Sequence, residues 1–138
     1  MADSLSRWER VRAVLEGRKP DRPPVSVWRH FYEHEQTPDG LVEAMLDFQA
    51  RFGWDYMKVN PRAHYHVEDW GARYRYSGDP YTAPELEASP IRSPRDWEHL
   101  KALDPTRGVL GQHLKALERI RQGLKGEVPF LMTVFTPL

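Results

Sequence analysis

Polar side chains directly follow two segments that the residue pattern predicts to be strands. The segments are Val25–Trp28 and residues 56–59, which are short and rich in β-branched or aromatic side chains. In open α/β sheets, ligands bind outside the carboxyl ends of the strands, so the residues after both segments are expected to meet there. The substrate-binding residues predicted from this position are Arg29, His30, Asn60 and Arg62.

Two of these residues have side chains suited to particular chemistry. The planar guanidinium of Arg29 can make a bidentate contact with a substrate carboxylate, although a salt bridge to Glu33 would use the same group. His30 supplies an imidazole, a side chain that can act as a general acid near neutral pH. Arg29 and His30 are therefore expected to contact the substrate, and no catalytic residue is assigned.

Four histidines have spacings that suit metal ligands. His30 and His34 are four residues apart, and His64 and His66 are two apart. The alternative is that they are ordinary loop histidines that make hydrogen bonds, and no established two-histidine metal motif is present. No metal site is predicted for this chain, and a metal-dependent hydrolase is retained only as the weaker alternative.

The remaining pattern alternates helices with strands. Ser6 and Glu9 form a capping box at the start of a helix, and Thr37-Pro38 and Gly53 bound a second one. The other predicted elements are a hairpin at 72–76, a short helix at 93–103, a helix at 110–124 and a third strand at 128–135.

Strands joined by helical crossovers imply a parallel sheet, with the first strand beside the second and the second beside the third. Three parallel strands leave two unpaired edges, which is an incomplete architecture. The fold class is therefore predicted to be α/β: the N-terminal part of a (β/α)8 TIM barrel, with crossover helices and a small hairpin excursion. Residues 1–138 form a single partial domain.

Composition excludes several classes of partner. The 138 residues carry 20 Lys and Arg against 20 Asp and Glu, so no basic excess favours nucleic acid. The longest apolar stretch, residues 128–135, is too short to cross a membrane. Cysteine is absent, which is compatible with the reducing environment of the cytoplasm, the expected location.

Several segments together resemble the uroporphyrinogen decarboxylase family. They are Gly-Arg-Lys-Pro-Asp-Arg-Pro-Pro-Val at 17–25, Trp28-Arg29-His30, Phe52-Gly53-Trp54-Asp55 and Val128-Pro129-Phe130. The resemblance covers essentially the whole chain and implies a (β/α)8 barrel of which this chain supplies the front. The family contains decarboxylases of uroporphyrinogen and, among their relatives, corrinoid-dependent methyltransferases with a zinc site in the C-terminal half.

The chain departs from the pattern of the decarboxylases at two places. Arg29 matches the first of two arginines that bind substrate carboxylates, whereas Glu33 stands where the second is expected. An aspartate expected near Asn60, Pro61 or Arg62 is missing. A substrate with eight carboxylates needs cations, so these departures indicate a relative of the housekeeping enzyme.

The expected activity of the protein is decarboxylation of a carboxylate-bearing small molecule, with a tetrapyrrole among the candidates. No cofactor is expected in this chain, while the corrinoid-dependent methyltransferase alternative would require zinc and a corrinoid. The expected partners are the small-molecule carboxylate and either the remainder of the barrel or a second copy of the chain. A non-catalytic association module is the alternative from another class.

Overall fold

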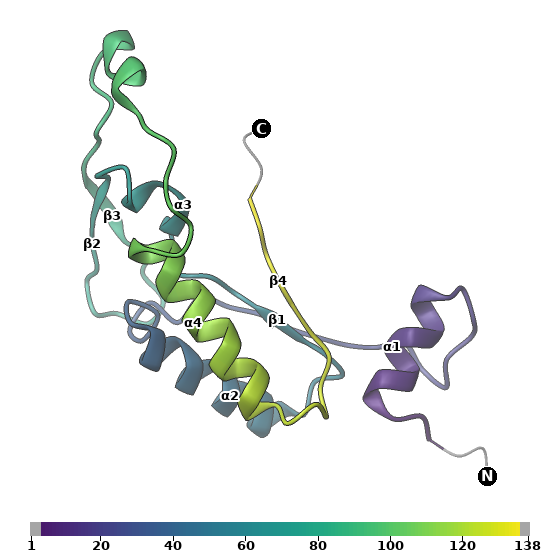
Figure 1. The fold of residues 1–138 in the computed structure, drawn as a ribbon. Coiled ribbons are helices and arrows are strands. Elements are labelled where there is room, and N and C mark those ends of the chain that lie inside the picture. Colours follow the sequence, from purple (N-terminus) through teal and green to yellow (C-terminus); the bar gives the residue numbers. More distant parts are fainter. Residues whose placement is uncertain (1–3, 136–138) are drawn as a thin grey trace.

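The computed structural model describes residues 4–135, in which helices and short strands form a mixed α/β arrangement (Figure 1). The elements are α1 (Arg7–Leu15), α2 (Pro38–Phe52), β1 (Met57–Val59), α3 (Tyr65–Glu68), β2 (Arg73–Arg75), β3 (Glu85–Ala88), the 3₁₀ helix η1 (Pro94–His99), α4 (Gly108–Gly123) and β4 (Phe130–Met132).

Strands β1 and β4 pair in parallel, which confirms the predicted pairing of the second and third strands. Met57 and Val59 of β1 are buried against α2 and α4. Lys58 pairs in register with Leu131 on the opposite side of the sheet, and Leu131 is 49% exposed. We call this second side, which carries Lys58 and Leu131, the open face. The core on the helical side contains Phe31, Leu41, Val42, Met45, Met57, Val59, Ala116, Ile120, Leu124 and Val128.

The prediction that Val25–Trp28 forms a buried strand is wrong for the structure described. The Asp55 N–H donates to the carbonyl of Val25 at 2.9 Å, but no ladder follows from this bond. The N–H of Val25 is bound by the carboxylate of Asp55 at 2.8 Å instead. Val27 and Trp28 are each 48% exposed, because nothing in residues 4–135 covers their outer side. A strand needs a continuous partner, and residues 25–28 have one only at their first residue.

Local signals placed the helix ends correctly. The Ser6 hydroxyl accepts from the Glu9 N–H while the Glu9 carboxylate accepts from the Ser6 N–H, which is the predicted capping box. Thr37 caps α2, and Gly53 ends it with a φ of +64°. The helix predicted at 110–124 is α4, whereas the short helix predicted at 93–103 is the 3₁₀ helix η1, which ends at His99, four residues earlier than predicted.

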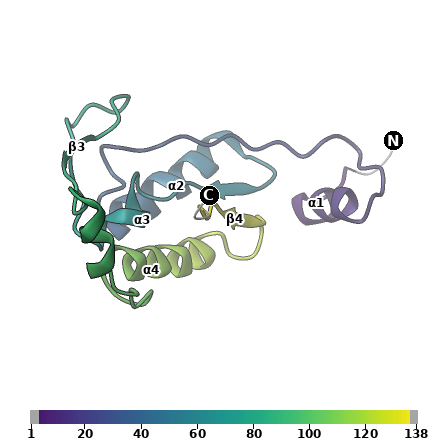
Figure 2. The same cartoon turned by 90° about the horizontal axis from the view of Figure 1, so that it is seen from above.

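Helix α1 stands apart from the layer formed by α2 and α4 (Figure 2). A buried ion network joins it to the start of β1. Arg10 contacts Asp55 at 2.7 Å and Asp21 at 2.7 Å, and Arg22 contacts the other Asp55 oxygen at 2.5 Å. The segment 17–25 therefore supplies Asp21 and Arg22 to a structural network that fixes the entry into β1.

Strands β2 and β3 form the predicted hairpin excursion. They pair antiparallel, with a register shift between Arg73 and Tyr74. Helix α3, which precedes the hairpin, was not predicted, because its four residues are too few to show a helical period. Within the described residues, none of the helices has the length and apolar character required to cross a membrane.

Candidate active site

His30 is held against a fully buried carboxylate. Its Nδ1 lies 3.1 and 3.2 Å from the two oxygens of Glu35, whose side chain is 0% exposed. The Glu35 oxygens also accept the backbone N–H groups of Phe31 at 2.9 Å and Ala63 at 2.7 Å. The two backbone donors fix the carboxylate, and the carboxylate in turn orients the imidazole.

Asn60 brings the end of β1 to the same imidazole. Its side-chain amide lies 2.8 Å from Nδ1 of His30, and the residue is 4% exposed. The ring of His30 stacks on Tyr32, with centroids 4.9 Å apart, and meets Trp28 edge-on at 6.1 Å. Burial, with the charge of Glu35 nearby, raises the pKa of Tyr32 above its usual value. His30 and Asn60 therefore converge as predicted.

The contact with Glu35 defines which nitrogen of His30 is free. An ionised carboxylate only accepts hydrogen bonds, so its contact with Nδ1 requires a proton on Nδ1. The amide of Asn60, whose Nδ2 lies 2.8 Å from the same nitrogen, must then turn its oxygen toward Nδ1. In the neutral ring the lone pair then lies on Nε2. Nε2 has no hydrogen-bond partner in residues 4–135, and the side chain is 28% exposed. This arrangement can take up a proton at Nε2 and donate it again, while Glu35 compensates the positive charge of the ring.

The structure places Arg62 in a different environment. Its guanidinium pairs with Glu68 at 2.6 Å and lies 5.7 Å from the ring of Tyr76. Burial raises the pKa of Glu68 although Arg62 opposes this shift, and burial also raises the pKa of Tyr76 to about 12. Arg62 is thus largely occupied by protein groups.

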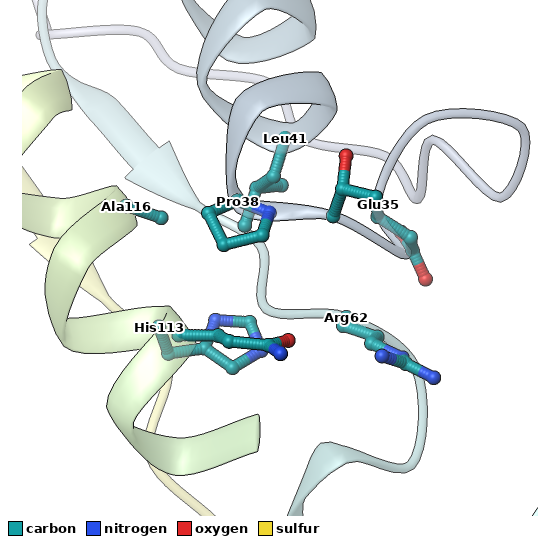
Figure 3. A pocket seen from close by; sticks show the side chains of 8 residues that line it. Glu35, Pro38, Leu41, Arg62, His113 and Ala116 are labelled. Atoms are coloured by element: carbon teal, nitrogen blue, oxygen red, sulfur yellow. The ribbon is translucent and has the colours of Figure 1, made fainter. Parts of the chain in front are cut away.

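Arg62 also borders a narrow cleft between α2 and α4 (Figure 3). The figure shows His113 beneath Pro38 and Leu41, whereas the guanidinium of Arg62 extends away from them. The cavity measures about 10 Å³, which is room for one water molecule at most. Burial lowers the pKa of His113 to about 4, so this histidine is neutral at pH 7. The cleft is too small for an organic substrate.

The side chain of Arg29 does not contact the imidazole of His30 or the side chain of Asn60. It donates to the carbonyls of His30 at 2.8 Å and Pro80 at 2.9 Å. Its guanidinium lies 5.2 Å from the rings of both Phe31 and Tyr81. Of the four predicted residues, the structure therefore brings His30 and Asn60 together, and it does not bring Arg29 or Arg62 to the same point. The roles of all four in substrate binding stay predictions.

The other loop histidines do not assemble a metal site. His64 stacks on Tyr74 at 3.9 Å, with a φ of +62° that is strained for a residue other than glycine. Burial lowers the pKa of His64 below its usual value. His66 lies against Phe135, and His34 is mostly exposed. Across residues 4–135, no group of three histidine, aspartate or glutamate side chains is placed to hold a metal ion.

Two residues of the site were missed from the sequence. Glu35 lies in a polar run with Glu33 and His34, and nothing local distinguishes the one carboxylate that becomes buried. Lys58 lies within β1, and its Nζ is 4.2 Å from the ring centroid of Trp28. The alternation of buried Met57 and Val59 with Lys58 is a signal that could have found it, because it places a cation on the face away from the core.

The comparison with protein-family models gives one match that spans most of the chain. The model described as uroporphyrinogen decarboxylase (URO-D) matches residues 6–138. No curated protein and no solved structure matches the chain. The match includes the 17–25 segment, the His30 loop and both strands of the parallel pair. The chain therefore belongs to the uroporphyrinogen decarboxylase family.

Proposed function

We propose that this chain is the N-terminal part of a (β/α)8-barrel enzyme that decarboxylates a carboxylate-bearing small molecule, with His30 as the proton donor. The observation that carries the proposal is the contact of Nδ1 with buried Glu35, which leaves Nε2 free. The barrel is supported by family membership, by the parallel pairing of β1 with β4, and by an open face on which Trp28 and Leu131 are half exposed.

The proposed reaction needs one proton and no external oxidant or reductant. The bond between the substrate carbon and its carboxylate breaks, and CO₂ leaves without the bonding electron pair. That pair stays on the substrate carbon, which then takes the proton from Nε2 of His30. Glu35 stabilises the imidazolium before the transfer, because it lies 3.1 Å from Nδ1 at a site shielded from water.

The charges around the site favour a substrate with few carboxylates. Glu33 lies 3.9 Å from Arg29 and offsets part of its charge. The guanidinium of Arg62 is paired with Glu68. A tetrapyrrole with eight carboxylates requires a strongly cationic site, and these two arginines do not provide one. We therefore favour a smaller acid over uroporphyrinogen.

Methyl transfer is the second candidate, and the same departures from the decarboxylase pattern favour it. Glu33 occupies the place of a carboxylate-binding arginine, as expected for a relative with a different substrate. Zinc and a corrinoid would be needed in that case. Residues 4–135 contain no group of three donors for zinc, so the ligands would have to come from outside the described segment.

The test measures CO₂ release by the gene product that carries this chain. Uroporphyrinogen III, pyrrole-2-carboxylate and benzene-1,2-dicarboxylate are offered as substrates, and the products formed in D₂O are examined for deuterium. His30→Gln is compared with His34→Gln, which changes an exposed histidine of the same loop. We expect the first variant to lose at least ~100-fold in rate, the typical contribution of a general acid, and the second to stay active.

Two results would overturn the proposal. One is wild-type activity in His30→Gln. The other is an absence of CO₂ release from every acid offered, and demethylation of methylcobalamin in the same preparation would then establish the methyltransferase alternative.

A further inference from the structure

A lysine lies in the middle of the parallel strand pair, on the side away from the helices. Met57 and Val59 are 2% and 1% exposed in the core, so the side chain of Lys58 projects onto the open face. Its Nζ lies 4.2 Å from the centroid of the Trp28 ring. Asn60 follows two residues later on the same face and contacts His30. Lys58 is therefore a neighbour of the proton-transfer group.

The ammonium group of Lys58 has no anionic partner in residues 4–135. No carboxylate lies within 4.0 Å of its Nζ, and none of its three donors makes a hydrogen bond there. Contact with the Trp28 ring stabilises the charge but leaves those N–H donors free. A cation between apolar neighbours in a strand is costly unless another group uses it. Among the described residues, Lys58 is thus a cation without an anionic partner.

Thr133 adds a hydroxyl group beside this cation. It follows β4, and its N–H donates to the carbonyl of Val59 at 3.4 Å, which continues the ladder past Met132. Thr133 is two residues beyond Leu131, the register partner of Lys58, and so projects onto the same face. Its Oγ1 is buried and has no hydrogen-bond partner among the described residues. Within residues 4–135, the strand register therefore places a hydroxyl without a hydrogen-bond partner on the face that carries Lys58.

We propose that Lys58 and Thr133 bind a carboxylate of the substrate, with the ring of Trp28 as the adjoining wall. The inference rests on the function proposed above and names the group that recognises the substrate. Arg29, the expected carboxylate ligand, is instead occupied by two carbonyl groups and two aromatic rings. A charge-assisted contact to a carboxylate satisfies the donors that Lys58 and Thr133 leave free.

The carboxylate held by Lys58 is not the one that leaves as CO₂. A cation bound to the leaving carboxylate stabilises the charge that must be withdrawn in the transition state, and it would slow the reaction. The bound carboxylate anchors the substrate, while a second carboxylate on the carbon near His30 is lost. The substrate class is therefore a small acid with at least two carboxylates.

The experiment measures binding of benzene-1,2-dicarboxylate to the gene product by quenching of tryptophan fluorescence. Lys58→Met is compared with Lys58→Arg, which keeps the charge, and with Lys115→Met, which removes an exposed lysine of α4. We expect Lys58→Met to weaken binding at least ~10-fold, as for a lost charge-assisted hydrogen bond. The Arg variant should bind within a few-fold of wild type and Lys115→Met with unchanged affinity. Equal affinity of Lys58→Met and wild type would overturn the inference.

A second variant keeps the test decisive if Lys58→Met does not fold. Thr133→Val retains the shape of the side chain and removes only the hydroxyl, so it is expected to weaken binding about 3- to 10-fold with no change in the circular dichroism spectrum. Unchanged binding in this variant excludes Thr133 from the subsite. Trp28→Phe should abolish most of the quenching signal, and a full signal in this variant would place the probe elsewhere.

His30→Gln separates the inference from the proposed function. This variant should bind the probe as wild type does, because its imidazole does not contact the anchoring carboxylate, yet it should release no CO₂. Loss of binding in Lys58→Met together with wild-type catalysis in His30→Gln would support the subsite and refute the proton donor. The reverse pair of results would support the proton donor and refute the subsite.

Discussion

Replacement of Glu35 tests the centre of the candidate site. The carboxylate accepts the N–H groups of Phe31 and Ala63, and it lies beside Nδ1 of His30 with no exposure to solvent. Glu35→Ala leaves both backbone N–H groups buried and unpaired. Each unpaired donor costs about 1–3 kcal/mol, so the free energy of unfolding is expected to fall by about 2–6 kcal/mol.

Glu35→Gln is expected to have a smaller effect on stability. The carbonyl oxygen of the amide can accept one of the two N–H groups, whereas the amide nitrogen faces the other donor. One unpaired donor remains, and the expected loss is about 1–3 kcal/mol. The amide also removes the carboxylate that accepts from Nδ1 of His30, so the ring is no longer held with its proton on Nδ1 in this variant.

Urea unfolding of the gene product measures the first effect, and nitrogen-15 NMR of the histidine side chains measures the second. Glu43→Gln, at an exposed position of α2, is the matched control and should change stability by less than about 0.5 kcal/mol. A loss below about 1 kcal/mol in Glu35→Ala would refute the assignment of both backbone bonds to this carboxylate. An unchanged tautomer of His30 in Glu35→Gln would refute its orienting role.

Three further predictions concern the surrounding framework. Burial by itself raises the pKa of Asp55, but the hydrogen bonds and charge of Arg22 and its neighbours lower this pKa overall. The ionised carboxylate therefore stabilises the folded protein above about pH 4, and this stabilisation is lost as the pH falls through the lowered pKa of the folded state. Asp55→Asn should therefore lower the free energy of unfolding by about 3–5 kcal/mol at pH 7 and by less at pH 2. Urea unfolding at both pH values measures this difference, and an equal loss at both would contradict the prediction. Gly108→Ala should lower the melting temperature, because Gly108 has a φ of +55° and an added Cβ would collide with the carboxylate of Asp69, which caps α4. A melting temperature equal to that of wild type would show that the cap is dispensable. The phenol of Tyr76 should ionise only near pH 12, and a titration at 295 nm should lose this late step in Tyr76→Phe.

The helix ends could be predicted because their signals are local. The Ser6 hydroxyl and the Glu9 carboxylate lie within one turn of each other, so the capping box depends on four consecutive residues alone. Gly53 is likewise the residue that the left-handed end of α2 requires. The same reasoning does not extend to Val25–Trp28. Its β-branched residues favour an extended chain, but a strand also requires a partner along its full length.

The candidate site was predicted only where it depends on strand ends. His30 and Asn60 follow two extended segments that run side by side, and they meet at 2.8 Å. Arg29 precedes His30, and alternation along the extended chain directs it to the opposite side with Phe31. The burial of Glu35 was beyond prediction from the sequence, because it depends on N–H groups of Phe31 and of Ala63, which is 28 residues away.

The charged groups near His30 support the proposal of a small acid as the substrate. Asp21 and Arg22, which belong to the 17–25 segment that resembles the family, are engaged with Arg10 and Asp55 and hold α1 in place. That similarity therefore reflects the framework and says little about the substrate. Arg29, near Glu33, donates to protein carbonyls, so its guanidinium is largely occupied by groups of the protein. Lys58 lies on the open face against the ring of Trp28, and our proposal that it binds one carboxylate together with Thr133 favours a compact acid over a tetrapyrrole with eight carboxylates.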